Sequence, residues 1–150
     1  MASIAVGRRL EILLVEDEVV DATQMRMALD EADIHHNLHV VEDGEMALSF
    51  LRNEGRYEDV PAPDMALVDI SLPKMDGLEL LAEIRSDPDL RYLPVVILTG
   101  SQNPEHVRRA YELHANLYVT KSVTFDEFAV VLEKVFKVIE LPRVSAREDA

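Results

Sequence analysis

The chain has 150 residues, 48% of them hydrophobic, no cysteine and a formal net charge of −14 at pH 7. This composition excludes general disorder, disulfides and thiol chemistry, and the negative charge argues against nucleic acid as a partner, because duplex binding needs cations that neutralise phosphates. The length suggests one domain with its own core, and residues 1–10 fit neither a signal peptide nor a membrane span, so a cytoplasmic protein is expected.

Five apolar runs predict strands, and a segment with helical periodicity follows each of them. The expected strands are residues 10–15, 38–41, 65–69, 94–99 and 117–119. The expected helices are residues 19–32, 46–55, 77–85, 104–113 and 124–139. Thr124 and Glu127 have the spacing of a capping box at the start of the last helix.

The alternation of strands and helices predicts a parallel sheet covered on both faces. Right-handed crossovers leave few topologies, and the order 2-1-3-4-5 is the common one for five strands. We therefore expect a flavodoxin-like, doubly wound α/β fold. The domain is expected to span residues 10–141, between an N-terminal tail at 1–9 and a C-terminal tail at 142–150 that is too short to be an output domain.

The central feature of the chain is the run Met65–Asp69, which is entered from Pro-rich sequence and left through Pro73 and Gly77. Four apolar residues followed by a carboxylate predict a strand buried on both faces. Ligands of parallel sheets bind at the carboxyl ends of the strands, where Asp69 lies. Taken alone, an Asp at such a position is more often a turn residue or a helix cap.

Other strands also end in polar residues: Glu16 and Asp17 follow the first, Thr99 ends the fourth and Lys121 follows the fifth. In the expected order the first and third strands are neighbours, so their carboxylates meet. Two such charges repel by roughly 4 kcal/mol at an effective dielectric near 20, so the cluster must bind protons or a hard cation. Oxygen ligands suit Mg²⁺, and the lysine and threonine suit phosphoryl oxygens. These residues predict phosphoryl transfer with Asp69 as the nucleophile.

Four motifs carry a resemblance to a known family: ILLVEDE at 12–18, LVDISLPKMDG at 67–77, PVVILTG at 94–100 and YVTK at 118–121. Together they resemble the CheY-like receiver domain of response regulators in two-component signalling. The resemblance extends from residue 11 to residue 139.

The resemblance implies a switch protein rather than an enzyme, phosphorylated by a sensor histidine kinase with Mg²⁺ as cofactor. It implies roles for seven residues: Glu16 and Asp17 as the acidic pair, Asp69 as phosphoacceptor, the Ser71 carbonyl as a further Mg²⁺ ligand, Thr99 and Lys121 as phosphoryl contacts, and Tyr118 as the aromatic switch.

Three positions depart from the family pattern. Gly100 replaces a usual alanine and leaves the phosphoryl pocket open; Ser122 replaces a usual proline, so a cis bond is not expected there; and the turn at 113–116 lacks its usual glycine. With the long loop at 56–63, these features are similar to single-domain regulators that serve phytochrome-type histidine kinases.

Signalling is expected to proceed through the face formed by the fourth helix, the fifth strand and the fifth helix. Phosphorylation would draw Thr99 and Lys121 toward the phosphoryl group, and Tyr118 would fill the vacated space. The receiver of the signal would be a separate downstream protein or a second copy of the chain. We expect a homodimer through this side, which includes residues 125–139.

Three other functions are compatible with parts of this pattern. A phosphohydrolase with an aspartyl nucleophile needs a second acid two residues after Asp69, where Ser71 stands. An FMN carrier needs a glycine- and hydroxyl-rich loop after the first strand, where residues 16–18 are all acidic. A receiver-like interaction module that ignores phosphate stays open as the alternative. His35, His36 and His39 are interpreted as solvated histidines rather than a metal site.

Overall fold

The computed structural model describes residues 9–32, 34–100, 103–121, 126–127 and 129–134. Its five strands are all parallel and lie in the order β2-β1-β3-β4-β5, as expected from the sequence. The strands are β1 (Leu10–Val15), β2 (His36–Val41), β3 (Met65–Asp69), β4 (Val95–Thr99) and β5 (Leu117–Thr120).

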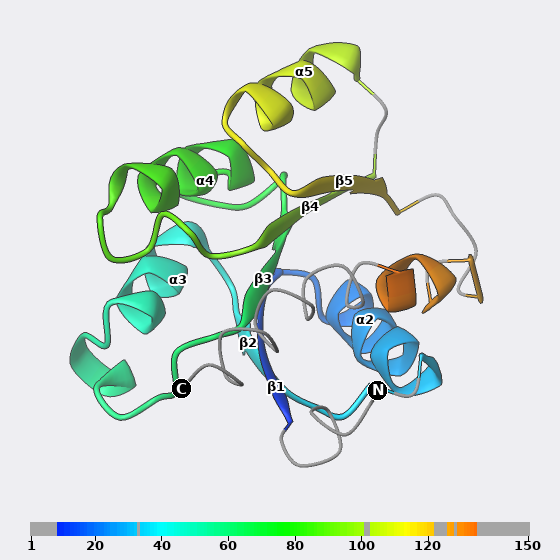
Figure 1. Cartoon of the computed structure of the whole chain (residues 1–150), viewed down its shortest axis with the longest axis horizontal. Coiled ribbons are helices and arrows are strands. Elements are labelled where there is room, and N and C mark those ends of the chain that lie inside the picture. The colour runs from blue at the N-terminus through cyan, green and yellow to red at the C-terminus, as the bar shows by residue number, and fades with distance from the viewer. Residues whose placement is uncertain (1–8, 33, 101–102, 122–125, 128, 135–150) are drawn as a thin grey trace, which may run out of the picture.

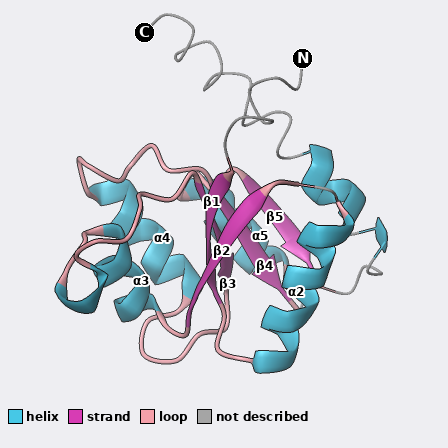
Figure 2. Ribbon diagram, turned by 90° about the horizontal axis from the view of Figure 1, so that it is seen from below, coloured by secondary structure: helices cyan, strands magenta, loops and turns pink. Residues whose placement is uncertain are grey.

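Helices cover both faces of the sheet (Figure 1 and Figure 2). They are α2 (Val19–Glu31), α3 (Gly44–Leu51), α4 (Gly77–Ser86) and α5 (Pro104–Glu112), with a short 3-10 helix η1 (Gly55–Tyr57) and further helical residues at 126–127 and 129–134. α2 and the segment 129–134 lie on one face, and α3, α4 and α5 lie on the other. None of the helices in the described part of the chain is long and apolar enough to span a membrane.

The core consists of two clusters, one on each face of the sheet, and β1 contributes to both. Leu13 and Val15 point into the cluster under α3, α4 and α5, whereas Ile12 and Leu14 point into the cluster under α2. Successive strand residues face opposite sides, so a strand with a helix layer on each side must be apolar at every position. This explains the continuous apolar runs of β1, β3 and β4.

The end of α3 differs from the sequence prediction, which placed it near Gly55. The helix ends at Leu51, and Asn53 then takes a left-handed backbone with φ of 54°. The Asn53 side-chain amide donates to the carbonyl oxygens of Tyr57 (3.1 Å) and Val60 (2.9 Å). One asparagine therefore links the end of α3 to two points of the long loop before β3.

Gly77, the first residue of α4, lies against the backbone at the end of β3. A Cβ atom at this position would lie 2.4 Å from the carbonyl oxygen of Asp69 and 2.8 Å from Cα of Ile70, so only glycine fits. A capping box one residue earlier fixes the helix start: the Asp76 carboxylate accepts from the Glu79 N–H at 2.8 Å, and the Asp76 N–H donates to the Glu79 carboxylate at 3.1 Å. Thr124 of the capping box expected from the sequence lies outside the described residues.

The turn before β5 lacks glycine, and His114 takes the left-handed conformation there, with φ of 66°. The carbonyl oxygen of His114 accepts hydrogen bonds from Arg85 Nε (3.1 Å) and Nη2 (2.9 Å). Arg85 Nη1 also donates to the carbonyl of Leu93 at 2.7 Å, and Nη2 donates to Asn116 Oδ1 at 3.0 Å. One side chain thus ties the end of α4 to the amino ends of β4 and β5.

Candidate functional site

The acidic residues predicted from the sequence meet at the carboxyl edge of the sheet. β1 pairs with β3 in a register that sets Val15 opposite Val68, so the residues that follow these two come together. Glu16, Asp17 and Asp69 each offer a carboxylate oxygen, and these oxygens lie within 4.8 Å of one another. Glu16 and Asp69 are buried, and Asp17 is half-buried.

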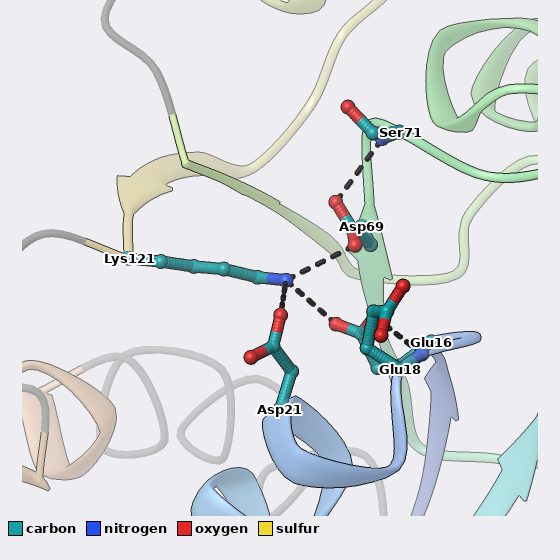
Figure 3. Close-up of polar contacts among 6 residues, drawn as sticks. All are labelled: Glu16, Glu18, Asp21, Asp69, Ser71 and Lys121. Atoms are coloured by element: carbon teal, nitrogen blue, oxygen red, sulfur yellow. Dashed lines mark hydrogen bonds and ion pairs between the residues drawn. The ribbon is translucent and has the colours of Figure 1, made fainter.

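Lys121 extends into this cluster from the end of β5 (Figure 3). Its Nζ atom lies 2.7 Å from Glu16 Oε1, 2.9 Å from Asp21 Oδ2 and 3.0 Å from Asp69 Oδ2. An ammonium group has three N–H donors, so each donor has a carboxylate partner. The lysine is placed by β5, whose neighbour β4 sets Thr99 opposite Thr120.

The charges of the cluster shift the protonation of its members. Burial raises the pKa of Glu16 to about 7, and the nearby Asp69 charge acts in the same direction, while hydrogen bonds from Lys121 and the Glu18 N–H oppose the shift. Burial alone would lower the pKa of Lys121, but its hydrogen bonds to Glu16, Asp21 and Asp69 raise that pKa above its ordinary value. The site therefore favours a charged lysine and resists full ionisation of its carboxylates.

The Asp69 carboxylate is held from two sides. Oδ2 accepts from Lys121 Nζ, and Oδ1 accepts from the backbone N–H of Ser71 at 3.1 Å. This second contact closes a turn directly after the strand, because the side chain bonds to its own backbone two residues later. The backbone of Ser71 thus holds the Asp69 carboxylate in place.

Thr99 lies on β4, which pairs with β3, and Tyr118 lies on β5, on the far side of β4. Thr99 ends β4 one residue after Leu98, which pairs with Asp69, and it is 2% exposed. Tyr118 lies in β5, is half-buried and packs against the core cluster under α3, α4 and α5. Its backbone N–H donates to the hydroxyl of Tyr111 in α5 at 3.2 Å.

Gly100 follows Thr99, and a Cβ atom built there would meet no heavy atom within 4 Å. The expectation that glycine leaves the phosphoryl pocket open stays a prediction. Ser122, on the other side of Lys121, lies outside the described residues.

Asp21 was not predicted as a site residue, yet it contacts Lys121 directly. It lies in the first turn of α2, four residues after Asp17. Helical spacing does not relate the two residues, because α2 begins at Val19 and Asp17 precedes it, so no sequence pattern indicated this contact.

The three histidines near β2 are not part of this cluster. His39 Nε2 lies 2.7 Å from Glu11 Oε1, and His36 Nδ1 contacts the carbonyl of Ile34 at 2.6 Å. Within the described ranges, the residues that could together hold a metal ion are the three carboxylates at the strand ends.

Comparison with known proteins agrees with this geometry. Residues 12–133 match the family model of the response regulator receiver domain. The response regulator Rcp1 of Synechocystis sp. is 48% identical over 111 residues, which cover 74% of this chain and 76% of that protein.

Two solved structures are also similar. The phosphorylated cyanobacterial phytochrome response regulator RcpA is 37% identical, with a TM-score of 0.80 over 90% of this chain and 96% of that chain. The Mn²⁺-bound form of Rcp1 is 42% identical, with a TM-score of 0.76 over 85% and 91%. With its sheet order, the acids at its strand ends and the match over most of its length, this chain belongs to the response regulator receiver domain family.

Proposed function

We propose that the chain is a cytoplasmic response regulator that accepts a phosphoryl group on Asp69 from a sensor histidine kinase and passes the signal to a partner protein. The observation that carries the proposal is the contact of Lys121 with Asp69 inside a cluster of carboxylates. A nucleophilic carboxylate beside an ammonium is the pairing that phosphoryl transfer to an acid requires. Because the similar RcpA is a phytochrome response regulator by name, a phytochrome-type kinase is the proposed donor.

The carboxylate cluster fits a divalent cation. Its oxygens lie within 4.8 Å of one another, and their crowding contributes to the raised pKa of Glu16. We propose that Asp17, Asp69 and the Ser71 carbonyl would hold Mg²⁺, with Glu16 acting through a water molecule. When bound, the ion would neutralise the carboxylates and the incoming phosphoryl oxygens. The Mn²⁺-bound form of the similar Rcp1 supports a divalent cation of this kind.

Asp69 acts as the nucleophile in the proposed transfer. A P–O bond forms to one of its carboxylate oxygens as the P–N bond of the phosphohistidine breaks, and the imidazole nitrogen leaves with the bonding electron pair. The Ser71 N–H holds the carboxylate in one orientation, and Lys121 donates to the phosphoryl oxygens. Because the transition state is loose, positioning and charge neutralisation supply most of the catalysis.

The signal is proposed to leave through Thr99 and Tyr118. Thr99, buried at the end of β4, would move toward the acyl phosphate, and Tyr118 would occupy the vacated space. This movement would change the face formed by α5, β5 and the helical residues 126–127 and 129–134, because α5 and β5 are joined by the Tyr111–Tyr118 hydrogen bond. A two-state packing change of this kind is how a local charge event reaches a partner.

We also propose that this face forms a homodimer. Tyr111 of α5 is 47% exposed and Val130 of the segment 129–134 is 49% exposed, and a second copy would cover both side chains. Phe125 and residues 135–139, which the sequence also assigns to this face, lie outside the described residues. Analytical ultracentrifugation at micromolar concentration should show a dimer; monomer alone, with and without phosphorylation, would reject it.

The receiver domain is assigned to residues 10–141, with tails on either side. The family match over 12–133 and the start of β1 at Leu10 support the assignment.

One experiment tests the proposed function. The purified protein is incubated with Mg²⁺ and acetyl phosphate, and intact mass spectrometry should detect one added, hydroxylamine-labile phosphoryl group. Asp69→Asn should abolish the addition. Asp76→Asn is the matched control, because Asp76 caps α4 close by and should retain it. Labelling that survives Asp69→Asn contradicts the assignment, and an unlabelled parent protein favours an interaction module that ignores phosphate.

A further inference from the structure

Three carboxylates hold the Lys121 ammonium, and they are not equivalent. Glu16 and Asp69 belong to the group of oxygens that converge within 4.8 Å, together with Asp17. Asp21 lies outside that group among the described residues, yet its Oδ2 atom is 2.9 Å from Lys121 Nζ. Figure 3 shows it on the α2 side of the lysine, away from Ser71. Asp21 therefore contacts the lysine without being placed to share a metal ion.

Exposure separates Asp21 from the other two partners. The Asp21 side chain is 36% exposed, whereas those of Glu16 and Asp69 are 2% and 7% exposed. Asp21 also belongs to the first turn of a helix of 13 residues, where the helix dipole favours a negative charge. It is thus a fixed, water-facing carboxylate on an element separate from the strand that carries the phosphoacceptor.

From this geometry we propose that Asp21 is a positioning residue for Lys121. It keeps one of the three ammonium donors engaged, so that the lysine stays at the site when its contacts with Glu16 and Asp69 are exchanged for a contact with a phosphoryl oxygen. Without Asp21, the long lysine side chain loses this contact and samples more rotamers. Ordering Lys121 against a phosphoryl oxygen then costs more conformational entropy, which destabilises the phosphorylated state. The part of this inference that concerns the phosphoryl contact rests on the proposed function. The anchoring of the Lys121 amine by Asp21 does not depend on that function.

The reactivity of the amine tests the anchoring directly. Lys121 is acylated with limiting acetic anhydride, and the product is measured by peptide mass spectrometry. Lys74, whose side chain is 61% exposed, is the internal reference. Asp21→Ala should raise labelling of Lys121 relative to Lys74 by about twofold to fivefold, because the side chain leaves the cluster more often when one partly exposed ion pair is lost. Asp21→Asn, which keeps an acceptor oxygen, should raise it less.

Asp30→Ala is the matched control, because Asp30 lies on the same helix with a side chain 71% exposed, and its Oδ1 atom is 4.0 Å from His36 Nε2. It should leave Lys121 labelling unchanged. Melting curves of all variants identify any loss of folding. Equal Lys121 labelling in the parent and in Asp21→Ala would overturn the proposal.

Phosphorylation by acetyl phosphate provides the second measurement. Asp21→Ala and Asp21→Asn remove the same charge, so a difference between them reports the hydrogen bond alone. We expect Asp21→Ala to be phosphorylated about twofold to tenfold more slowly than Asp21→Asn; equal rates would overturn the positioning role. If the parent accepts no phosphoryl group, the proposed function fails, and the labelling result still decides whether Asp21 anchors Lys121.

Discussion

Glu16 should make the metal-free protein less stable as the pH rises. The residue is 3% exposed, and its carboxylate lies 2.7 Å from Lys121 Nζ and 3.1 Å from the Glu18 backbone nitrogen. Burial raises its pKa from an ordinary value of 4.5 to about 7. The folded protein therefore holds this proton more tightly than the unfolded chain does.

The sign and size of the effect follow from these two values. The stabilisation is fully present below the pKa of the unfolded chain and is lost as the pH rises through the folded pKa. The full difference corresponds to about 3 kcal/mol, of which about 2–3 kcal/mol falls between about pH 5 and about pH 8. The raised pKa of Lys121 affects stability only near and above its ordinary value, so the lysine does not contribute in this range.

The assay is urea denaturation followed by circular dichroism, in chelator, at several pH values. Glu16→Gln keeps the shape of the side chain but cannot titrate. Between about pH 5 and about pH 8, the free energy of unfolding of this variant should therefore fall by about 2–3 kcal/mol less than that of the parent. Only the slopes are compared, because one amide cannot reproduce both hydrogen bonds of the carboxylate. Parallel curves for the parent and Glu16→Gln would refute the reasoning. Saturating Mg²⁺ should reverse the slope of the parent, because cation binding favours ionised carboxylates.

Three further predictions concern residues around the site. Asp17→Asn should raise the melting temperature in chelator, because it removes one of the crowded charges. It should also abolish most of the stabilisation by Mg²⁺, which in the parent is about 2.7 kcal/mol at a hundredfold excess over Kd. A lower melting temperature with a full Mg²⁺ response would contradict this. Gly77→Ala should destabilise by about 1–3 kcal/mol and slow phosphorylation, because the new methyl group would meet the Asp69 backbone; Gly100→Ala is the control, with open space around it. His114→Gly should stabilise by about 0.5–1 kcal/mol in urea denaturation, because it relieves the left-handed backbone of an exposed residue; no change would show that the turn costs nothing.

The sequence predicted some elements closely and others poorly, and burial explains the difference. β3 was predicted at its observed bounds, because a strand buried on both faces has an unbroken apolar run. β2 was predicted to begin at residue 38, but it begins at His36. It is an edge strand, and its partial exposure lets polar residues occur within it, which hides its start.

The acids of the site could be predicted because the strand order alone places the ends of the strands together, independently of side-chain conformation. The contact of Asp21 with Lys121 spans 100 residues of sequence, and it depends on the reach of a long side chain across the sheet edge. The pattern of apolar residues in the sequence cannot predict a contact of this kind. The left-handed backbone of His114 was hidden for a related reason, since the glycine that usually marks such a turn is absent.

The hydrogen bonds of Arg85 have a mechanical consequence. They tie together the amino ends of β4 and β5, where Asn116 adds a further tie through its side-chain contact with the Val95 N–H at 2.8 Å. Thr99 and Lys121 lie at the opposite, carboxyl ends of the same two strands. A displacement at the carboxyl ends would therefore leave the amino ends near Arg85 in place, so that the two strands rotate about their amino ends. In hydrogen exchange, the amides of Val95 and Asn116 should keep their protection on phosphorylation, while those near Thr99 change.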